Sequence, residues 1–147
     1  MSNKYDCLKL ENQICFPLYV VSKEVIRKYT PLLEELDLTY TQYICMMALW
    51  DKKVMNVKDL GEALYLDSGT LTPLLKKLEA KNYITRERNT LDERIVVVNI
   101  TDEGLKLRDK ALSVPSHIGS CIKLSEDDAK TLYKLLHKIM DNNLING

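Results

Sequence analysis

Apolar residues recur at i, i+3 and i+4 along much of the chain, which is the spacing of one buried face of an α-helix. The first such stretch begins near Cys15 and predicts a long helix that ends at about Leu36. Pro17 is compatible only with the start of this helix, and the pair Thr30-Pro31 predicts a break or kink further along it. We therefore expect a long first helix with a break or a kink in its second half.

The next two helices are marked by residues that cap helix N-termini. Thr39 precedes a helical segment that runs to Trp50, and Gln42, three residues after Thr39, completes a capping box. Asn56 predicts the start of a short third helix, because its side chain can accept a hydrogen bond from a free backbone N–H. Both helices carry apolar residues on one face only.

A fourth helix is predicted to follow Asp67 or Ser68, either of which can cap it. Pro73 lies early in this helix and removes one backbone hydrogen bond. One face repeats leucine at helical spacing, at Leu71, Leu74, Leu75 and Leu78. The leucines are expected to face the core, which leaves the polar residues of the helix toward solvent.

After the fourth helix the pattern changes to short runs of β-branched residues. Residues 83–88 and 94–100 are such runs, and the polar segment 89–93 separates them. This arrangement predicts a two-stranded β-hairpin. A hairpin of this kind is not stable alone and must pack against the helices.

The last part of the chain is again helical in pattern. Residues 101–112 predict one helix, and Ser125 caps a final amphipathic helix. Between them, Val114-Pro115 and Gly119 predict a loop or irregular segment.

The order of these elements predicts a mainly α fold with a small β-hairpin, namely a winged helix-turn-helix. We expect one domain over residues 1–147, with a DNA-binding lobe at about 56–100. The outer helices, at about 11–36 and 101–144, are long and apolar for a monomer of this size. They are therefore predicted to form a homodimer, which would place two recognition helices about 34–36 Å apart, one turn of DNA.

Charge agrees with this division of the chain. The 21 basic and 21 acidic residues cancel, and a zero total is weak evidence against non-specific nucleic-acid binding. Of the three parts 1–67, 68–94 and 95–147, only the middle one has more basic than acidic residues. That part holds the fourth helix and the hairpin.

Composition excludes several other classes of protein. Hydrophobic residues make up 46% of the chain, so a core can form and disorder is not expected. No apolar leader is visible, and the longest apolar run, Tyr43 to Trp50, is too short to cross a bilayer. We therefore expect a cytoplasmic protein without membrane contact, whose thiols are reduced by default. The spacing of its cysteines predicts no metal site, and no cofactor is expected.

The polar residues of the fourth helix and the hairpin are suited to contact DNA. Hydroxyl groups in the first turn can bind bases and phosphates, and lysines one turn later can bind phosphates. An arginine at the wing tip can enter the minor groove, and a neighbouring aspartate can orient it through an ion pair. The predicted DNA-binding residues are Ser68, Thr70, Thr72, Lys76, Lys77, Arg86, Asp92 and Arg94.

These motifs resemble a known family. The run from Leu64 to Glu79 is similar to the recognition-helix motif of the MarR family, and the Asp92-Glu93-Arg94 segment resembles its wing. Within it, Leu-Asp-Ser-Gly-Thr-Leu-Thr-Pro and the earlier Glu-Asn-Gln-Ile-Cys-Phe resemble the branch of organic hydroperoxide resistance regulators. The resemblance covers roughly residues 11–140. It implies a homodimeric repressor that leaves a pseudo-palindromic double-stranded operator when an organic hydroperoxide or another oxidant oxidises a sensor thiol.

On this resemblance Cys15 is the sensor. Only a thiolate reacts quickly with peroxide, and the N-terminus of a helix favours the anion. Tyr19 lies one turn after Cys15, and tyrosine hydroxyls can donate hydrogen bonds to a thiolate. Tyr29 and Tyr40 match positions that, in the resembled branch, reach the sensor cysteine across the dimer interface. Cysteine 45 is interpreted as an inert core residue.

Oxidation of Cys15 would first give a sulfenic acid. Some members of the branch then form a disulfide with a cysteine in the C-terminal part of the other subunit. Cys121 lies in that region of this chain. A mixed disulfide with a small thiol is the alternative.

Two other functions remain open from the sequence. A MarR-type regulator that responds to a small hydrophobic ligand would share every feature except the role of Cys15. A thiol peroxidase is the enzyme alternative, but the chain has no thioredoxin-type βαβ pattern and no evident general base beside Cys15. We therefore expect a regulator and not an enzyme.

Overall fold

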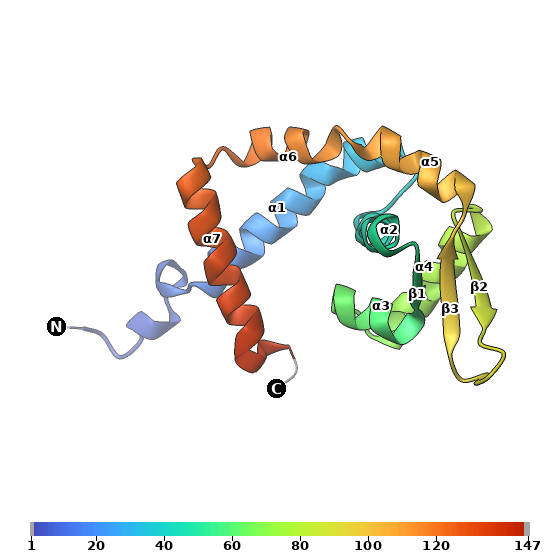
Figure 1. Cartoon of the computed structure of the whole chain (residues 1–147). Helices are drawn as coiled ribbons and strands as arrows, with labels where there is room; N and C mark the ends of the chain where they lie inside the picture. The colour runs from blue at the N-terminus through green and yellow to red at the C-terminus, as the bar shows by residue number, and fades with distance from the viewer. Residues whose placement is uncertain (1, 146–147) are drawn as a thin grey trace.

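The computed structural model describes residues 2–145, and it consists of helices around a small antiparallel sheet (Figure 1). Two 3-10 turns precede the first long helix, and a short π-helical turn follows the last one. The elements are η1 (Asp6–Leu8), η2 (Leu10–Asn12), α1 (Cys15–Glu34), α2 (Tyr40–Lys52), β1 (Val54–Asn56), α3 (Val57–Leu64), α4 (Ser68–Ala80), β2 (Ile84–Arg88), β3 (Val96–Ile100), α5 (Asp102–Ala111), α6 (Val114–Ile122), α7 (Glu126–Ile139) and η3 (Met140–Leu144).

The predicted helix caps are confirmed. The Thr39 side chain accepts a hydrogen bond from the Gln42 N–H, and the Gln42 side chain accepts one from the Thr39 N–H, which completes the capping box at α2. Asn56 caps α3, Asp67 caps α4 and Ser125 caps α7 in the same way. Each cap satisfies a backbone donor that the helix itself leaves free.

Two predicted interruptions of helices are absent. Helix α1 is not broken at Thr30-Pro31 but continues to Glu34, with the exposed Pro31 inside it, and a kink there stays a prediction. The segment around Pro115 and Gly119 is not a loop but helix α6. Pro115 stands in the first turn of α6, where a missing N–H leaves no intrahelical bond unmade.

The predicted hairpin is part of a three-stranded sheet with the order β1-β3-β2. Strand β3 pairs antiparallel with β2, with Arg86 opposite Val98. It also pairs antiparallel with β1, with Met55 opposite Val98. The predicted hairpin of β2 and β3 is therefore confirmed, and the third strand, β1, which was not predicted, pairs with the other edge of β3.

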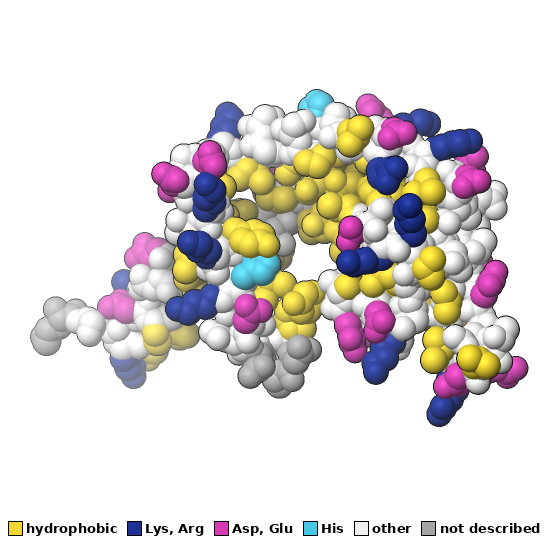
Figure 2. Space-filling view, viewed as in Figure 1, with side chains coloured by type: hydrophobic (Ala, Val, Ile, Leu, Met, Phe, Trp, Pro, Cys, Tyr) yellow, Lys and Arg dark blue, Asp and Glu magenta, His cyan; other side chains and the backbone are white. Residues whose placement is uncertain are grey.

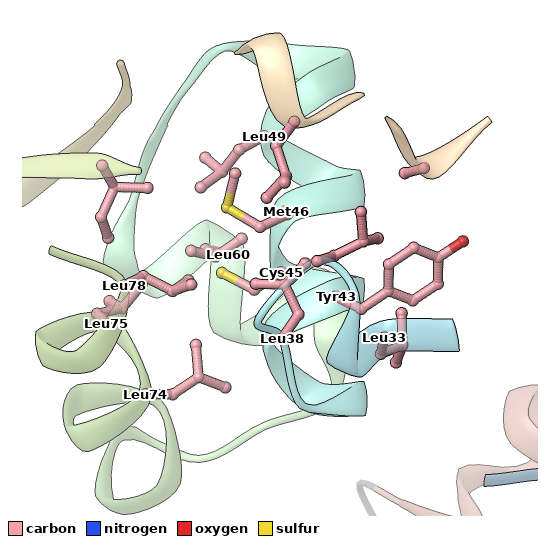
Figure 3. Close-up of a cluster of buried hydrophobic side chains, with 14 of the residues drawn as sticks. Leu33, Leu38, Tyr43, Cys45, Met46, Leu49, Leu60, Leu74, Leu75 and Leu78 are labelled. Atoms are coloured by element: carbon pink, nitrogen blue, oxygen red, sulfur yellow. The ribbon is translucent and has the colours of Figure 1, made fainter. Parts of the chain in front are cut away.

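The core lies where helices α1 to α6 and the sheet meet (Figure 3). The leucine face of α4 is buried in it as predicted. Cysteine 45 is also in this core, and burial raises the pKa of its thiol to about 12, so it is not a thiolate at neutral pH. Its fully buried residues are Leu33, Cys45, Met46, Leu49, Leu60, Leu71, Leu75, Leu78, Ile84 and Val98.

The outer helices are arranged differently from this core. Helix α6 lies along α1, and α7 leaves the end of α6 at a steep angle (Figure 1). The space-filling view shows an opening between α7 and the lobe, and apolar side chains surround this opening (Figure 2). No residue of α7 is buried. Within residues 2–145, no helix combines the length and hydropathy that a membrane span requires.

Candidate nucleic-acid interface and thiol site

The start of α4 presents polar groups to solvent. The Asp67 carboxylate accepts a hydrogen bond of 2.7 Å from the Thr70 N–H. Hydrogen bonds from Thr70 and Gly69 hold the pKa of Asp67 below its ordinary value, so the cap stays ionised. Of the residues predicted to contact DNA, Ser68, Thr70, Lys76 and Lys77 are exposed and Thr72 is half-buried. The leucine face fixes the roll of the helix, and this roll directs the polar residues outward.

The wing tip holds an ordered arginine. Arg94 donates two hydrogen bonds of 3.0 Å, from Nε and Nη2, to the two oxygens of the Asp92 carboxylate. This confirms the expected ion pair, and the hydrogen bonds from Arg94 lower the pKa of Asp92. The Asn89 side chain accepts hydrogen bonds from the N–H groups of Leu91 and Asp92, and these bonds shape the turn at the wing tip. Arg94 is thus oriented although its side chain is 91% exposed.

Helix α3 and the turn between α3 and α4 line one open cleft, together with residues 94–96 at the start of β3 and Ile145 near the C-terminus. Its volume is about 1000 Å³, and Ser68 of α4 and Arg94 of the wing are both on its wall. The predicted DNA contacts at the start of α4 and at the wing tip thus border the same cleft.

Arg86 has a different environment from the other predicted DNA contacts. Its guanidinium lies 3.0 Å from the Glu79 carboxylate, and its backbone N–H donates to the same carboxylate at 3.1 Å. The hydrogen bonds from Arg86 hold the pKa of Glu79 below its ordinary value. Arg86 therefore fastens the wing to α4, and its role toward DNA stays a prediction.

Sequence reasoning missed the contacts of a lysine that follows the C-terminal end of α4. The Lys81 ammonium group, just after α4, donates to the backbone carbonyl of Asp37 and, at 3.3 Å, to the side chain of Gln42. Asp37 lies in the turn between α1 and α2. The sequence showed only that this lysine lies off the leucine face of the helix. Its partners could not be predicted, because they are about 40 residues away along the chain.

The thiol site is divided between the two ends of α1. Cys15 is the first residue of α1 and is exposed, and Tyr19 one turn later is 62% exposed. Tyr29 lies at the far end of the helix, where its ring centroid is 4.9 Å from that of Tyr40. Fourteen residues of α-helix span about 21 Å, so Tyr29 cannot reach Cys15 of its own chain.

A third tyrosine, which sequence reasoning assigned only to the apolar pattern, joins this pair. The Tyr43 ring is 5.7 Å from Tyr29 and 6.4 Å from Tyr40. Burial, and then the neighbouring Tyr40, raise the pKa of Tyr29 and of Tyr43. These hydroxyls therefore remain protonated, and can donate hydrogen bonds, throughout the physiological range.

The remaining predicted thiol, Cys121, is exposed near the end of α6. Among residues 2–145, no group of three or more histidine, cysteine, aspartate or glutamate side chains is placed to hold a metal ion.

Known proteins share this arrangement. Residues 27–111 match the family model of the transcriptional regulator SarA/Rot. The chain is 45% identical to the organic hydroperoxide resistance transcriptional regulator of Bacillus subtilis, over 96% of both chains. The fold is thus that of a winged helix-turn-helix transcriptional regulator.

Solved structures of AbfR from Staphylococcus epidermidis are also similar. Reduced AbfR bound to DNA is 32% identical, with a TM-score of 0.77 over 95% of this chain and 98% of AbfR. Overoxidised AbfR bound to DNA is 31% identical, with a TM-score of 0.77 over 97% of this chain and 100% of AbfR. AbfR with its disulfide formed is 33% identical, with a lower TM-score of 0.65 over 92% of this chain and 96% of AbfR. This chain belongs to the SarA/Rot transcriptional regulators of the MarR family, in the branch of organic hydroperoxide resistance regulators.

Proposed function

We propose that this protein is a homodimeric DNA-binding regulator that leaves its operator when Cys15 is oxidised by an organic hydroperoxide. The observation that carries the proposal is the division of the thiol site along α1. Cys15 is exposed at one end, and the phenol rings of Tyr29 and Tyr40 are held together toward the other. An antiparallel pairing of two α1 helices would bring the tyrosines of one protomer to the cysteine of its partner.

The dimer is supported by the apolar side chains of α7. Leu132, Leu135, Leu136 and Ile139 lie on one face of this helix, and each is between 37% and 54% exposed. Together with exposed apolar residues of α1, they form a surface that water contacts in a single chain. We propose that α1, α6 and α7 dimerise, and that the lobe from α2 to β3 reads DNA.

DNA contact is assigned to the start of α4 and to the wing. Ser68, Thr70 and Thr72 would face the major groove, and Lys76 and Lys77 would bind phosphates. Arg94, oriented by Asp92, would enter the adjacent minor groove. Both lobes of a dimer must dock one DNA turn apart, so a change in dimer packing would release both.

The chemistry at Cys15 is a two-electron oxidation. The thiolate attacks an oxygen of the hydroperoxide, the O–O bond breaks, and the alkoxide leaves and takes a proton from water to become an alcohol. The sulfur becomes a sulfenic acid, which condenses with a second thiol to give a disulfide and water. We assign that second thiol to Cys121 of the partner subunit, with a small cellular thiol as the alternative.

The phenols of Tyr19, Tyr29 and Tyr40 would stabilise the thiolate by hydrogen bonds that the oxidised sulfur cannot accept equally. Loss of these bonds biases the dimer toward another packing. Each oxidised protomer consumes one equivalent of peroxide, so the protein acts as a sensor and not as an enzyme. A cytoplasmic location follows, because the reducing cytosol resets such a thiol.

The test is a DNA-shift titration at fixed salt, with reduced protein and with protein treated with cumene hydroperoxide. The probe is a duplex of about 30 base pairs, selected by the reduced protein from a random library, which is long enough for two half-sites. Wild type is expected to lose affinity on oxidation, and Cys15→Ser is expected to keep it. Cys7→Ser is the matched control, because Cys7 is also exposed.

Non-reducing gels of the same samples test the second thiol. An intersubunit crosslink that Cys121→Ser abolishes supports the disulfide between subunits. Release of Cys121→Ser with a mass increase of one small thiol supports the mixed disulfide. Release of Cys15→Ser by peroxide would overturn the proposed sensing mechanism.

A further inference from the structure

A row of aromatic rings leads from the tyrosine pair to the base of the wing. We call Tyr29, Tyr40, Tyr43 and Trp50 the aromatic row. Tyr43 contacts both Tyr29 and Tyr40, and its ring lies edge-on to Trp50 at a centroid distance of 6.2 Å. Edge-to-face rings at this distance attract one another in a preferred geometry. The row therefore follows α2 from its first residue, Tyr40, into its last turn.

The far end of the row is a hydrogen bond to the wing base. Trp50 Nε1 donates to the carbonyl oxygen of Gly104 at 2.8 Å, although the two residues are 54 positions apart. The Gly104 N–H donates to the Thr101 side chain, and the Thr101 N–H donates to the Tyr83 carbonyl. Trp50 is thus hydrogen-bonded to the first turn of α5, which directly follows strand β3 of the wing.

Gly104 makes this junction tight. A β-carbon at position 104 would lie 2.3 Å from the carbonyl oxygen of Tyr83 and 2.8 Å from Cγ1 of Ile100. The backbone of α5 is therefore in direct contact with the residues at the base of β2 and β3. A displacement of Gly104 cannot be absorbed locally and must move the wing.

The middle of the row is too closely packed to absorb a displacement. The Tyr43 side chain is 3% exposed and belongs to the main core (Figure 3). Packed interiors respond to a small shift by changing between discrete arrangements instead of deforming gradually. A rearrangement of Tyr40 is thus passed to Tyr43 and then to Trp50.

We propose that Tyr43 and Trp50 are positioning residues that transmit the arrangement of Tyr29 and Tyr40 to the base of the wing. Oxidation at Cys15 would move the tyrosines, shift Trp50 and Gly104, and displace Arg94 from the DNA. This inference rests on the proposed function and adds the route inside each protomer. It is independent of which second thiol closes the disulfide.

A second connection between these regions provides a matched control. Lys81 also joins the α1–α2 turn to the lobe, but through hydrogen bonds to Asp37 and Gln42. Lys81→Met removes this connection and leaves the aromatic row intact. Trp50→Phe keeps an aromatic ring in the row and removes only the bond to Gly104.

The experiment measures coupling, defined as the ratio of the DNA dissociation constants of oxidised and reduced protein. Oxidation of Cys15 is followed by mass spectrometry in every sample. In Trp50→Phe we expect full oxidation of Cys15, reduced-state affinity within about threefold of wild type, and coupling at least about tenfold lower. In Lys81→Met the coupling is expected to equal that of wild type. Equal coupling in Trp50→Phe and wild type would overturn the proposal.

A second measurement needs no substitution in the row. Trp50 is the only tryptophan of the chain, so its fluorescence reports its surroundings directly. Cumene hydroperoxide is expected to shift the emission of wild type and not of Cys15→Ser. Unchanged emission in a protein that has released DNA would refute the transmission route, even if Trp50→Phe fails to fold. If wild type keeps its DNA affinity after oxidation of Cys15, the proposed function itself fails.

Discussion

The lobe that we propose to read DNA and the last helix, α7, bury their apolar residues to very different extents. In the lobe, Leu60 and Leu78 have no exposed surface and Leu71 has 1%. In α7, the apolar residues repeat at the same helical spacing, yet none of them is buried. The lobe therefore completes its core within one chain, whereas α7 leaves its apolar face for a second copy. The proposed thiol sensor lies on α1, and thus in the part whose packing depends on association.

The largest effect is expected from a charge placed on the apolar face of α7, which tests whether this face needs a second copy. Leu136→Asp is expected to give a monomer, because burying an unpaired carboxylate at the interface is very unfavourable. With one half-site gripped instead of two, DNA affinity should fall by about a hundredfold or more. Sedimentation and DNA-shift titration measure the two effects.

Lys134→Asp is the control, since it puts the same side chain on the polar face of the same helix. It is expected to remain a dimer. A dimeric Leu136→Asp protein with normal affinity would show that α7 does not form the interface.

The junction between α5 and the base of the wing can be tested through Gly104. Gly104→Ala forces a β-carbon against the Tyr83 carbonyl, which is backbone and cannot rotate away. The free energy of unfolding is expected to fall by about 2–3 kcal/mol. Urea unfolding at fixed protomer concentration measures it.

The outer helices offer the matched glycine. A β-carbon at Gly119 in α6 would meet no atom within 4 Å, so Gly119→Ala should raise stability by about 0.5–1 kcal/mol. A similar loss in both variants would contradict the tight junction at the wing base.

A smaller effect is expected at the wing tip. Arg94→Ala should weaken DNA binding by the reduced protein about tenfold and leave dimerisation unchanged. Asp92→Asn should have a weaker effect, because it only frees an arginine that is still present. Arg108→Ala, on the exposed side of α5, controls for the loss of a positive charge. If it weakens binding as much as Arg94→Ala, the assigned minor-groove contact is wrong.

The smallest expected effect is a pH dependence at the start of α4. The pKa of Asp67 is lower in the folded protein than its ordinary value of 3.8. Its stabilising effect is therefore fully present above that value and is lost as the pH falls through the lower, folded-state pKa. Asp67→Asn keeps a cap but removes this titration, so its stability should depend less on pH below about pH 4. Thermal unfolding between about pH 2.5 and about pH 6 compares Asp67→Asn with wild type and with Asp51→Asn as the control. Equal profiles for Asp67→Asn and wild type would contradict the assignment.

Local signals in the sequence were sufficient for most of the fold. The caps at Thr39, Asn56 and Ser125 and the leucine face of α4 depend on residues within one or two turns. Strand β1 escaped prediction because three residues are too few to show a strand period. Helix α6 escaped because Pro115 and Gly119 are typical of loops, although a first-turn proline and an exposed glycine are compatible with a helix.

The site was less accessible to sequence reasoning, since it depends on residues far apart in the chain. Cys15 and Tyr29 could be singled out by resemblance, but the contact of Tyr29 with Tyr40 and Tyr43 is tertiary. Tyr43 and Trp50 lie in an apolar run and look like ordinary core residues. Their partners are on α1 and α5, and no period along α2 could reveal them.

The central claim is that the redox state of Cys15 sets DNA affinity. Its most direct test is a stepwise addition of cumene hydroperoxide to the DNA-bound dimer, with fluorescence anisotropy of the duplex and the mass of the Cys15 peptide measured at each step. The account predicts that the released fraction follows the fraction of Cys15 in disulfide form, and that dithiothreitol restores binding. Release while Cys15 is still reduced, or retention of DNA after Cys15 is fully converted to a disulfide, would contradict it.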